Sequence, residues 1–557
     1  MAKETLFRNG SVFDGHRFLP KGTSVLVSGD GRIAEVGASV TPAGTSEVVD
    51  LDGGTLLPGF IDSHAHPVYG GNQLRHCDLN HAETQDQYQA IIAGYAQAHP
   101  DEEWITGGGW GMPAFPGGIP TRQALDAVTG ERPAFLQNRD GHGAWVNSKA
   151  LSLAGIDRST PDPADGRIER DADGYPVGCL QEGAKDLVAR LLPETTEEDF
   201  YRGLLAAQDY LLSLGITGWQ DAIVGRSPGE GDPTVAYLRA ASAGTLIANV
   251  VGALWWDRDR GLEQLEELLH LRATGRAGRF RATSVKMMLD GVAENHTAAM
   301  LDPYLDHDGC ASANHGINFI DPAELPRFVT ALDREGFQVH FHALGDRAVR
   351  NALNAIEAAG PSSNRHHLAH LQVIHPDDIA RFARLHATAN IQPLWATHEA
   401  QMDELTIPFL GEQRARWQYP FAALLAAGTN LCAGSDWPVS SPDPLLGSHV
   451  AVNRSVPFSE GSTAQANPFL PEQAIDLVTT LAAYTSGSAR VNGLEETVGA
   501  IHPGYDADFA IVDADLATIR SEEICQASVR QTWVRGQVAF HSAAFHSAGF
   551  HSAGFQS

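Results

Sequence analysis

The chain has 557 residues, of which 43% are hydrophobic and 19% charged, as expected for a soluble globular protein with an ample core. Its net charge of −29 argues against nucleic acid and anionic membranes as partners, because both need a basic surface. The five cysteines form no CxxC pair, no 18-residue apolar run is present and the first residues lack the apolar core of a signal peptide. We therefore expect a cytoplasmic protein without a disulfide framework or a membrane span.

Both ends of the chain predict short β-strands. Asn9-Gly10 and Asp30-Gly31 are strong hairpin signals within the first 57 residues. The predicted strands are 5–8, 11–13, 24–27, 33–36, 47–50, 497–501, 509–513 and 532–540. We interpret residues 1–57 and 496–540 as one small β-sandwich domain built from both chain termini.

The middle of the chain, residues 58–495, alternates strand and helix patterns, which predicts parallel βα units and a TIM (β/α)8 barrel of the α/β class. The clearest unit is a strand at 338–343 followed by a helix at 346–359. In that helix apolar residues recur at i, i+3, i+4 and i+7, and Gly360 supplies a stop. The next strand is expected at 367–373.

Residues 541–557 are a low-complexity tail that repeats a five-residue FHSA-type unit. His541, His546 and His551 recur every five positions, a period that fits neither a helix face nor a strand face. A His-rich tract can bind metal, but we expect a disordered tail without a catalytic role.

An apolar strand near residue 60 ends in the pair His64 and His66. Side chains alternate along a strand, so both imidazoles point to the same face, roughly 7 Å apart along the backbone. At the carboxyl end of a barrel strand such a pair can share a divalent metal. Taken alone, the pair also fits two ordinary strand-end histidines.

Three later strands end in further metal-ligating groups, His342, His370 and Asp436. The gap of 28 residues between the two histidines (370 − 342) is about one βα step, and the next 66 (436 − 370) leave room for two more. All of these ligands would then face the same barrel mouth.

Lys286 lies inside an otherwise apolar strand, where an ammonium group is costly to bury. Carboxylation by CO₂ would give a carbamate that can bridge two metals. The alternative is an ion pair with Asp290 or Glu294.

Seven segments carry a resemblance that runs from about residue 5 to 540: PGFIDSHAHP, DGHGAWVNSKAL, VKMMLDG, HFHALGDRAV, AHLQVIHPDD, GSDWPV and GYDADFAIVD. Together they resemble the amidohydrolase superfamily, and in detail amidohydrolase family 3, the YtcJ-like branch that includes N-substituted formamide deformylase. That branch commonly has glutamate before the strand-6 histidine, whereas this chain has Ala369, so any support from that glutamate is missing.

The resemblance implies one or two divalent metals, with zinc best suited to this nitrogen and oxygen set. The implied ligands are His64 and His66 for the more buried metal, Lys286 as a bridging carbamate, His342 and His370 for a second metal, and Asp436 for the first. Asp436 would also act as the catalytic base. Glu182 is an alternative metal bridge.

Candidate substrate residues follow a strand at 133–137, in a Gly-rich segment of the kind that builds pockets. There His142 is a candidate for holding the substrate carbonyl or the oxyanion, with local hydrogen bonding as the alternative. Asp140, Trp110, Trp395 and Trp437 are further candidates for substrate binding, although aromatic residues near strand ends often serve packing instead.

These features predict a metal-dependent hydrolase that cleaves an amide-type C–N bond, such as that of an N-acyl or N-formyl amine, in a small molecule. Asp436 would take a proton from the attacking water and return it to the leaving amine. The same chemistry fits an esterase, lactonase or carbamate hydrolase, and a non-catalytic binding or regulatory scaffold is the alternative of another class. A homodimer is also compatible with the sequence.

Overall fold

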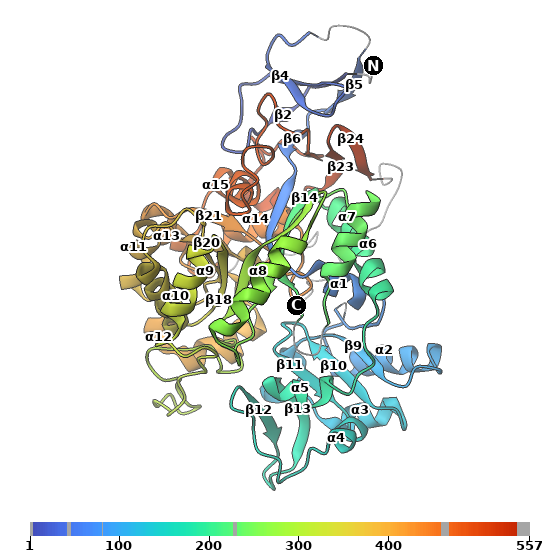
Figure 1. Cartoon of the computed structure of the whole chain (residues 1–557), viewed down its shortest axis with the longest axis vertical. Coiled ribbons are helices and arrows are strands. Elements are labelled where there is room, and N and C mark those ends of the chain that lie inside the picture. Colours follow the sequence, from blue (N-terminus) through green and yellow to red (C-terminus); the bar gives the residue numbers. More distant parts are fainter. Residues whose placement is uncertain (1–3, 42–45, 81, 227–230, 458–466, 543–557) are drawn as a thin grey trace.

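Eight parallel strands form a nearly closed barrel in the computed structural model, which describes residues 4–41, 46–80, 82–226, 231–457 and 467–542 (Figure 1). In order around the barrel they are β7 (Phe60–Ala65), β14 (Ile216–Val224), β15 (Asn249–Trp255), β17 (Phe280–Met288), β18 (Gln338–Ala343), β19 (His367–His370), β20 (Thr388–Ile391) and β21 (Leu431–Ala433). The short strand β16 (Arg276–Ala277) pairs with β17 outside this order. The prediction of a TIM-barrel fold is confirmed.

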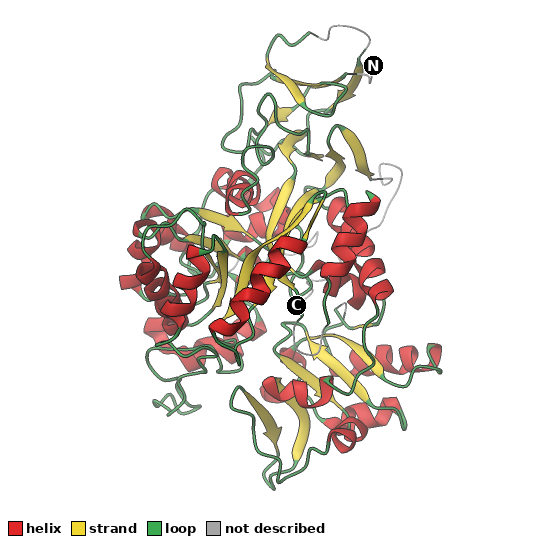
Figure 2. Cartoon of the chain, in the orientation of Figure 1, coloured by secondary structure: helices red, strands yellow, loops and turns green. Residues whose placement is uncertain are grey.

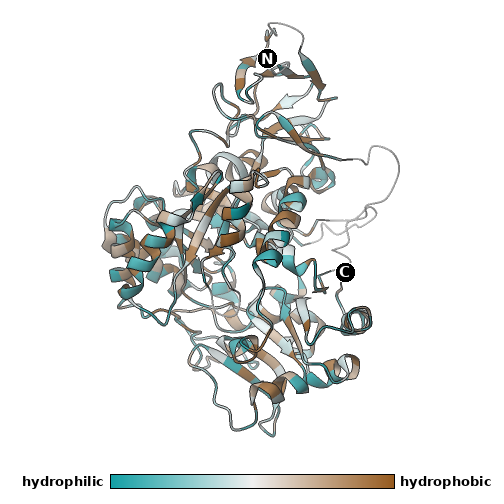
Figure 3. Ribbon diagram, turned by 45° about the vertical axis from the view of Figure 1, so that its right-hand side comes forward, coloured by the Kyte–Doolittle hydropathy of each residue, from teal (hydrophilic) through white to brown (hydrophobic). Residues whose placement is uncertain are grey.

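Helices surround the barrel strands (Figure 2). They are α1 (Pro67–Gln73), α6 (Glu197–Ser213), α7 (Thr234–Ala243), α8 (Leu265–Thr274), α9 (Leu325–Arg334), α10 (Asp346–Ala359), α11 (Pro376–Arg384), α12 (Ile407–Ala415), α13 (Phe421–Ala426), α14 (Pro444–Asn453), α15 (Leu477–Ala482) and α16 (Ser488–Val491). Figure 3 shows brown, apolar residues along the central strands and teal, hydrophilic residues on many of the peripheral helices. Among the residues that the structure describes, every helix is too short or too polar to cross a bilayer.

The β18–α10 unit follows from the local sequence pattern. The strand and the helix have the predicted bounds, and the apolar positions Val349, Ala352, Leu353 and Ile356 are all buried. Strand β19 ends earlier than expected, at His370, because that residue and Leu371 turn to positive φ (78° and 51°).

A second sheet of six strands is inserted between α1 and α6, at the lower end of the molecule in Figure 1. Its order is β12 (Gly166–Arg170), β13 (Pro176–Glu182), β11 (Gly143–Val146), β10 (Ala134–Asn138), β9 (Ile105–Trp110) and β8 (Cys77–Asp78). Helices α2 (Gln85–Ala98), α3 (Arg122–Thr129), α4 (Ser148–Ala154) and α5 (Asp186–Ala189) belong to the same segment. This sheet was not predicted from the sequence.

The two ends of the chain form two small sheets at the opposite end of the molecule (Figure 1). One has the order β4 (Ile33–Gly37), β3 (Ser24–Val27), β1 (Thr5–Arg8) and β5 (Glu47–Asp50). The other joins both termini in the order β2 (Ser11–Val12), β6 (Thr55–Pro58), β22 (Phe509–Val512), β23 (Val529–Val534) and β24 (Gln537–His541).

The ring of Phe7 connects these two sheets, because it contacts Phe509 at 5.4 Å and Trp533 at 5.1 Å between ring centroids. The expected strand at 497–501 is wrong. The N–H groups of Thr497 and Val498 donate to the carbonyl of Leu494 and close a turn instead. The domain limits at 57, 495 and 540 stay predictions, and the tail from residue 543 onward lies outside the described residues.

Candidate metal centre and active site

Side chains from four separate barrel strands meet at the carboxyl ends of those strands. Asp436 Oδ1 lies 3.1 Å from His64 Nε2 and 3.1 Å from His66 Nε2, and Asp436 Oδ2 lies 3.9 Å from His370 Nδ1. The ring of His370 lies 4.7 Å from that of His64 and 4.4 Å from that of His342. The structure thus brings together the five side chains that were predicted as ligands, His64, His66, His342, His370 and Asp436.

This cluster fits a divalent cation. Potential ligand atoms of His64, His370 and Asp436 lie within 4.8 Å of one another, and all three residues are buried. Neither ring nitrogen of His370 has a hydrogen-bond partner among the described residues. Because a buried polar atom without a partner is costly, a cation is a natural partner for this imidazole.

The protonation states also suit metal binding. Burial lowers the pKa of His64 to about 3 and lowers that of His370 well below its usual value. Burial alone would raise the pKa of Asp436, but the interactions with His64 and His66 hold it well below the usual range. The imidazoles of His64 and His370 are therefore neutral and the Asp436 carboxylate ionised near neutral pH, as metal ligation requires.

The backbone around Asp436 is shaped to place its carboxylate. Asp436 has a φ of 60°, and its N–H donates to the carbonyl of His64 at 2.7 Å. A Cβ at Gly434 would lie 2.7 Å from the backbone nitrogen of His64, so only glycine lets the chain after β21 approach β7 this closely. Strained non-glycine residues of this kind are frequent in active sites.

Two further buried residues support His64. Asp62 accepts hydrogen bonds from the N–H groups of His64 and Ser435, both at 3.0 Å, and burial raises its pKa to about 7. His340 Nε2 lies 2.8 Å from His64 Nδ1, which leaves His64 Nε2 facing Asp436. The role of Asp62 was not predicted, although this residue lies within the same strand motif as the histidines.

Lys286 lies beside the same imidazole. Its side chain on β17 is buried, and Nζ is 3.4 Å from His64 Nε2. Burial lowers its pKa to about 7. The alternative pairing with Asp290 is wrong, because the Asp290 carboxylate instead accepts the N–H groups of Ala299, Leu344 and Gly345. Among the described residues, Lys286 forms no ion pair with Glu294 either.

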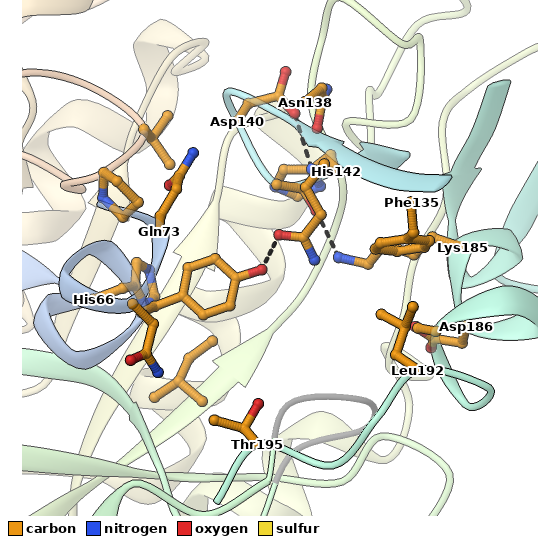
Figure 4. A pocket seen from close by; sticks show the side chains of 18 of the residues that line it. His66, Gln73, Phe135, Asn138, Asp140, His142, Lys185, Asp186, Leu192 and Thr195 are labelled. Carbon is orange, nitrogen blue, oxygen red and sulfur yellow. Dashed lines mark hydrogen bonds between the residues drawn. The ribbon is translucent and has the colours of Figure 1, made fainter. Parts of the chain in front are cut away.

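A cavity of about 840 Å³ extends from these residues toward the inserted sheet. Figure 4 shows His66 and Gln73 on one side, Phe135, Lys185 and Asp186 on the other, and His142 between them. The predicted substrate residues Asp140 and His142 both line this cavity.

The three predicted substrate-binding tryptophans are not among the described residues that line the cavity. Trp110 is buried against Phe115 and Trp145 in the inserted sheet. Trp437 packs on Tyr210, and Trp395 stacks on His370 at 5.4 Å with an interplanar angle of 6°. Packing, rather than contact with the cavity, accounts for the position of each.

His142 is held by Glu182. His142 Nδ1 lies 2.9 Å from Glu182 Oε2, and its ring centroid lies 5.3 Å from that of His342. Burial opposes protonation of His142, but Glu182 outweighs it and raises the pKa of the imidazole. Glu182 Oε1 accepts a hydrogen bond from Thr297 at 2.7 Å, so both carboxylate oxygens already have partners within the protein.

The barrel fold, with histidines, a lysine and an aspartate at its mouth, is that of a metal-dependent hydrolase, the class to which the family and the solved structure below also point. The model of the amidohydrolase family matches residues 47–540, and this chain belongs to that family. The family implies a divalent metal.

Three relatives match over most of their length. Protein LONG AFTER FAR-RED 3 of Arabidopsis thaliana is 31% identical, over 96% of this chain and 91% of its own. Putative amidohydrolase YtcJ of Bacillus subtilis is 30% identical, over 89% and 91%. N-substituted formamide deformylase of Arthrobacter pascens is 27% identical, over 93% and 94%.

A solved structure shares the fold. An uncharacterized metal-dependent hydrolase from Pyrococcus horikoshii superposes with a TM-score of 0.70 and 25% identity, over 93% of this chain and 99% of that one. The resemblance read from the sequence motifs is confirmed.

Proposed function

We propose that this protein hydrolyses the C–N bond of an amide-type small molecule, such as an N-acyl or N-formyl amine. The observation that carries the proposal is the position of Asp436, whose one carboxylate oxygen lies 3.1 Å from both His64 Nε2 and His66 Nε2 beside the cavity. The likeness to a formamide deformylase over 93% of the chain supports an amide as the substrate.

His64, His66, His370 and Asp436 would hold a divalent cation, with zinc best suited to these nitrogen and oxygen donors. When bound, such an ion lowers the pKa of water towards ~7 and polarises a carbonyl group. For a second ion, the ligands predicted from the sequence are His342, His370 and a carbamate on Lys286. His370 lies beside both Asp436 and His342, so it could serve the first ion or the second. The pKa of about 7 at Lys286 supports carbamate formation, because only an uncharged amine attacks CO₂.

Asp436 would move the proton. It is ionised near neutral pH and can accept a proton from the attacking water. The protonated Asp436 can then give that proton to the leaving nitrogen. His142, between the inserted sheet and His342, would donate a hydrogen bond to the carbonyl oxygen as negative charge develops on it.

Metal analysis of the purified protein, followed by assays with N-formyl amines, N-acetyl amines, lactones and p-nitrophenyl esters, tests the proposal. We expect bound divalent metal and turnover of the amides. Preference for the esters or lactones would replace the amide assignment, and a metal-free, inactive protein would favour a binding scaffold.

Asp436→Asn tests the proton transfer. We expect turnover to fall by at least about 100-fold, within the range for general acid–base groups, while the fold persists. Asp443→Asn is a matched control, because Asp443 caps α14 and asparagine caps helices equally well. Near-normal turnover in Asp436→Asn would reject the role of Asp436.

A further inference from the structure

The inserted sheet contributes His142 at the edge of the metal centre. This residue lies in the turn between β10 and β11, lines the cavity and contacts the ring of His342. Its position therefore depends on how the inserted sheet is placed against the barrel.

Glu182, at the end of β13, binds His142 twice. The N–H of Glu182 donates to the carbonyl of His142 at 2.7 Å, and its carboxylate accepts from His142 Nδ1 at 2.9 Å. Because Nδ1 is engaged in this way, Nε2 is the ring nitrogen left for a ligand in the cavity. Glu182 has a φ of 51°, in the left-handed region that is unfavourable for a residue with a side chain.

Thr297 connects this pair to the barrel. It lies in the loop after β17, the strand that carries Lys286, and the residue is 2% exposed. Its hydroxyl donates to Glu182 Oε1 at 2.7 Å and accepts from the N–H of Val292 at 3.0 Å.

Gly291 makes this approach possible. A Cβ there would lie 2.2 Å from Thr297 Oγ1 and 2.3 Å from Glu182 Oε1. Any side chain at this position would push the loop away from the inserted sheet. The hydrogen bond between Thr297 and Glu182 therefore depends on the close approach of the barrel loop to the end of β13.

We propose that Glu182 and Thr297 are positioning residues that fix the imidazole of His142, with Nε2 directed to the substrate carbonyl. The barrel loop orients Glu182, and Glu182 orients His142, so the two parts of the molecule act as one site. This inference rests on the proposed function for the role of His142, and it assigns Glu182 a task other than bridging metals.

Thr297→Val and Thr297→Ser form a matched pair. Valine keeps the volume but removes the hydroxyl, whereas serine keeps the hydroxyl. We expect kcat to fall about tenfold in Thr297→Val, at the low end for residues that orient active-site groups, with KM and metal content unchanged. Thr297→Ser should stay near the wild-type value, and equal losses in both variants would overturn the proposal.

A double-mutant cycle tests the link between Glu182 and His142. Glu182→Gln should lower kcat by about 10–100-fold at full metal content, and His142→Gln by about 100-fold or more. If Glu182 acts through His142, the double variant should be no slower than His142→Gln alone. Multiplied losses, or loss of metal in Glu182→Gln, would overturn the proposal.

Crystal structures provide a readout that is independent of turnover. We expect the bond between His142 Nδ1 and Glu182 in the wild type and in Thr297→Ser, and a displaced His142 ring in Thr297→Val. An unmoved ring in Thr297→Val would reject the positioning role. A wild type that keeps these bonds but hydrolyses no substrate would count only against the proposed function.

Discussion

The barrel mouth and the inserted sheet face one cavity, but different kinds of bond hold them there. The barrel ligands lie at the ends of hydrogen-bonded parallel strands, so strand register fixes their positions. The inserted sheet reaches the barrel side of the cavity through side-chain bonds, among them Tyr69 to Gln137, Arg258 to Asp165 and Thr297 to Glu182. The barrel half thus carries the candidate metal ligands, and the inserted half, joined to it by side chains, lines the other side of the cavity.

Among the variants that distinguish the barrel mouth from the inserted sheet, His370→Ala is expected to lower turnover most. Both ring nitrogens of His370 lack hydrogen-bond partners among the described residues, so its removal breaks no such bond within the protein. We expect metal content to fall and turnover to drop by at least about 100-fold, beyond the loss usual for residues that only support ligands. Metal analysis and activity assays measure both effects.

His386→Asn is the control for that change. His386 is exposed and has a φ of 54°, a conformation that asparagine tolerates. It should keep full metal content and turnover. A His370→Ala variant with wild-type metal content would remove His370 from the ligand set.

The same contrast explains what could be predicted from the sequence. The β18–α10 unit and the ligands at strand ends follow from local periodicity and from the rule that parallel strands share one carboxyl edge. The inserted sheet could not be predicted in this way. Strands β9 and β10 have the local pattern of barrel strands, and only their long-range pairing places them in a separate sheet. For the same reason Trp110 was predicted to bind substrate but packs inside that sheet.

Lys286→Met should change how stability depends on pH. In the folded, metal-free protein the pKa of Lys286 is about 7, whereas a lysine in the unfolded chain has a pKa near ~10.4. Between these values the unfolded state binds more protons, so the free energy of unfolding rises with pH. The rise is at most about 5 kcal/mol, at ~1.36 kcal/mol per pKa unit over about 3.4 units.

Urea unfolding from pH 6.5 to 9.5, with metal and CO₂ removed, measures this rise. The wild type should gain stability over the range, and Lys286→Met should lack that part of the gain because methionine carries no proton. Identical slopes for the two proteins would mean that the Lys286 amine is not desolvated in the folded state.

Arg258→Gln tests the inserted half. Arg258 forms an ion pair with Asp165 of the inserted segment, and its guanidinium lies 4.3 Å from the ring centroid of Phe319. All three residues line the cavity. We expect KM to rise about three- to tenfold with kcat nearly unchanged, since about 0.7–1.4 kcal/mol of uniform binding energy would be lost.

Arg260→Gln is the matched control, because Arg260 lies two residues away and pairs with the exposed Glu267. It should leave both kinetic constants unchanged. A fall in kcat for Arg258→Gln at constant KM would show that this half also contributes to the chemical step.

The smallest kinetic effect is expected from Trp110→Phe. Trp110 is 1% exposed, and its Nε1 donates to the carbonyl of Leu136 at 2.8 Å. Phenylalanine loses this hydrogen bond and leaves a small void, so the free energy of unfolding should fall by about 1–2 kcal/mol. Because Trp110 does not line the cavity, kcat/KM should stay within about twofold, a change of ~0.4 kcal/mol. A larger rise in KM at unchanged stability would restore Trp110 as a substrate contact and would mean that the inserted sheet rearranges when substrate binds.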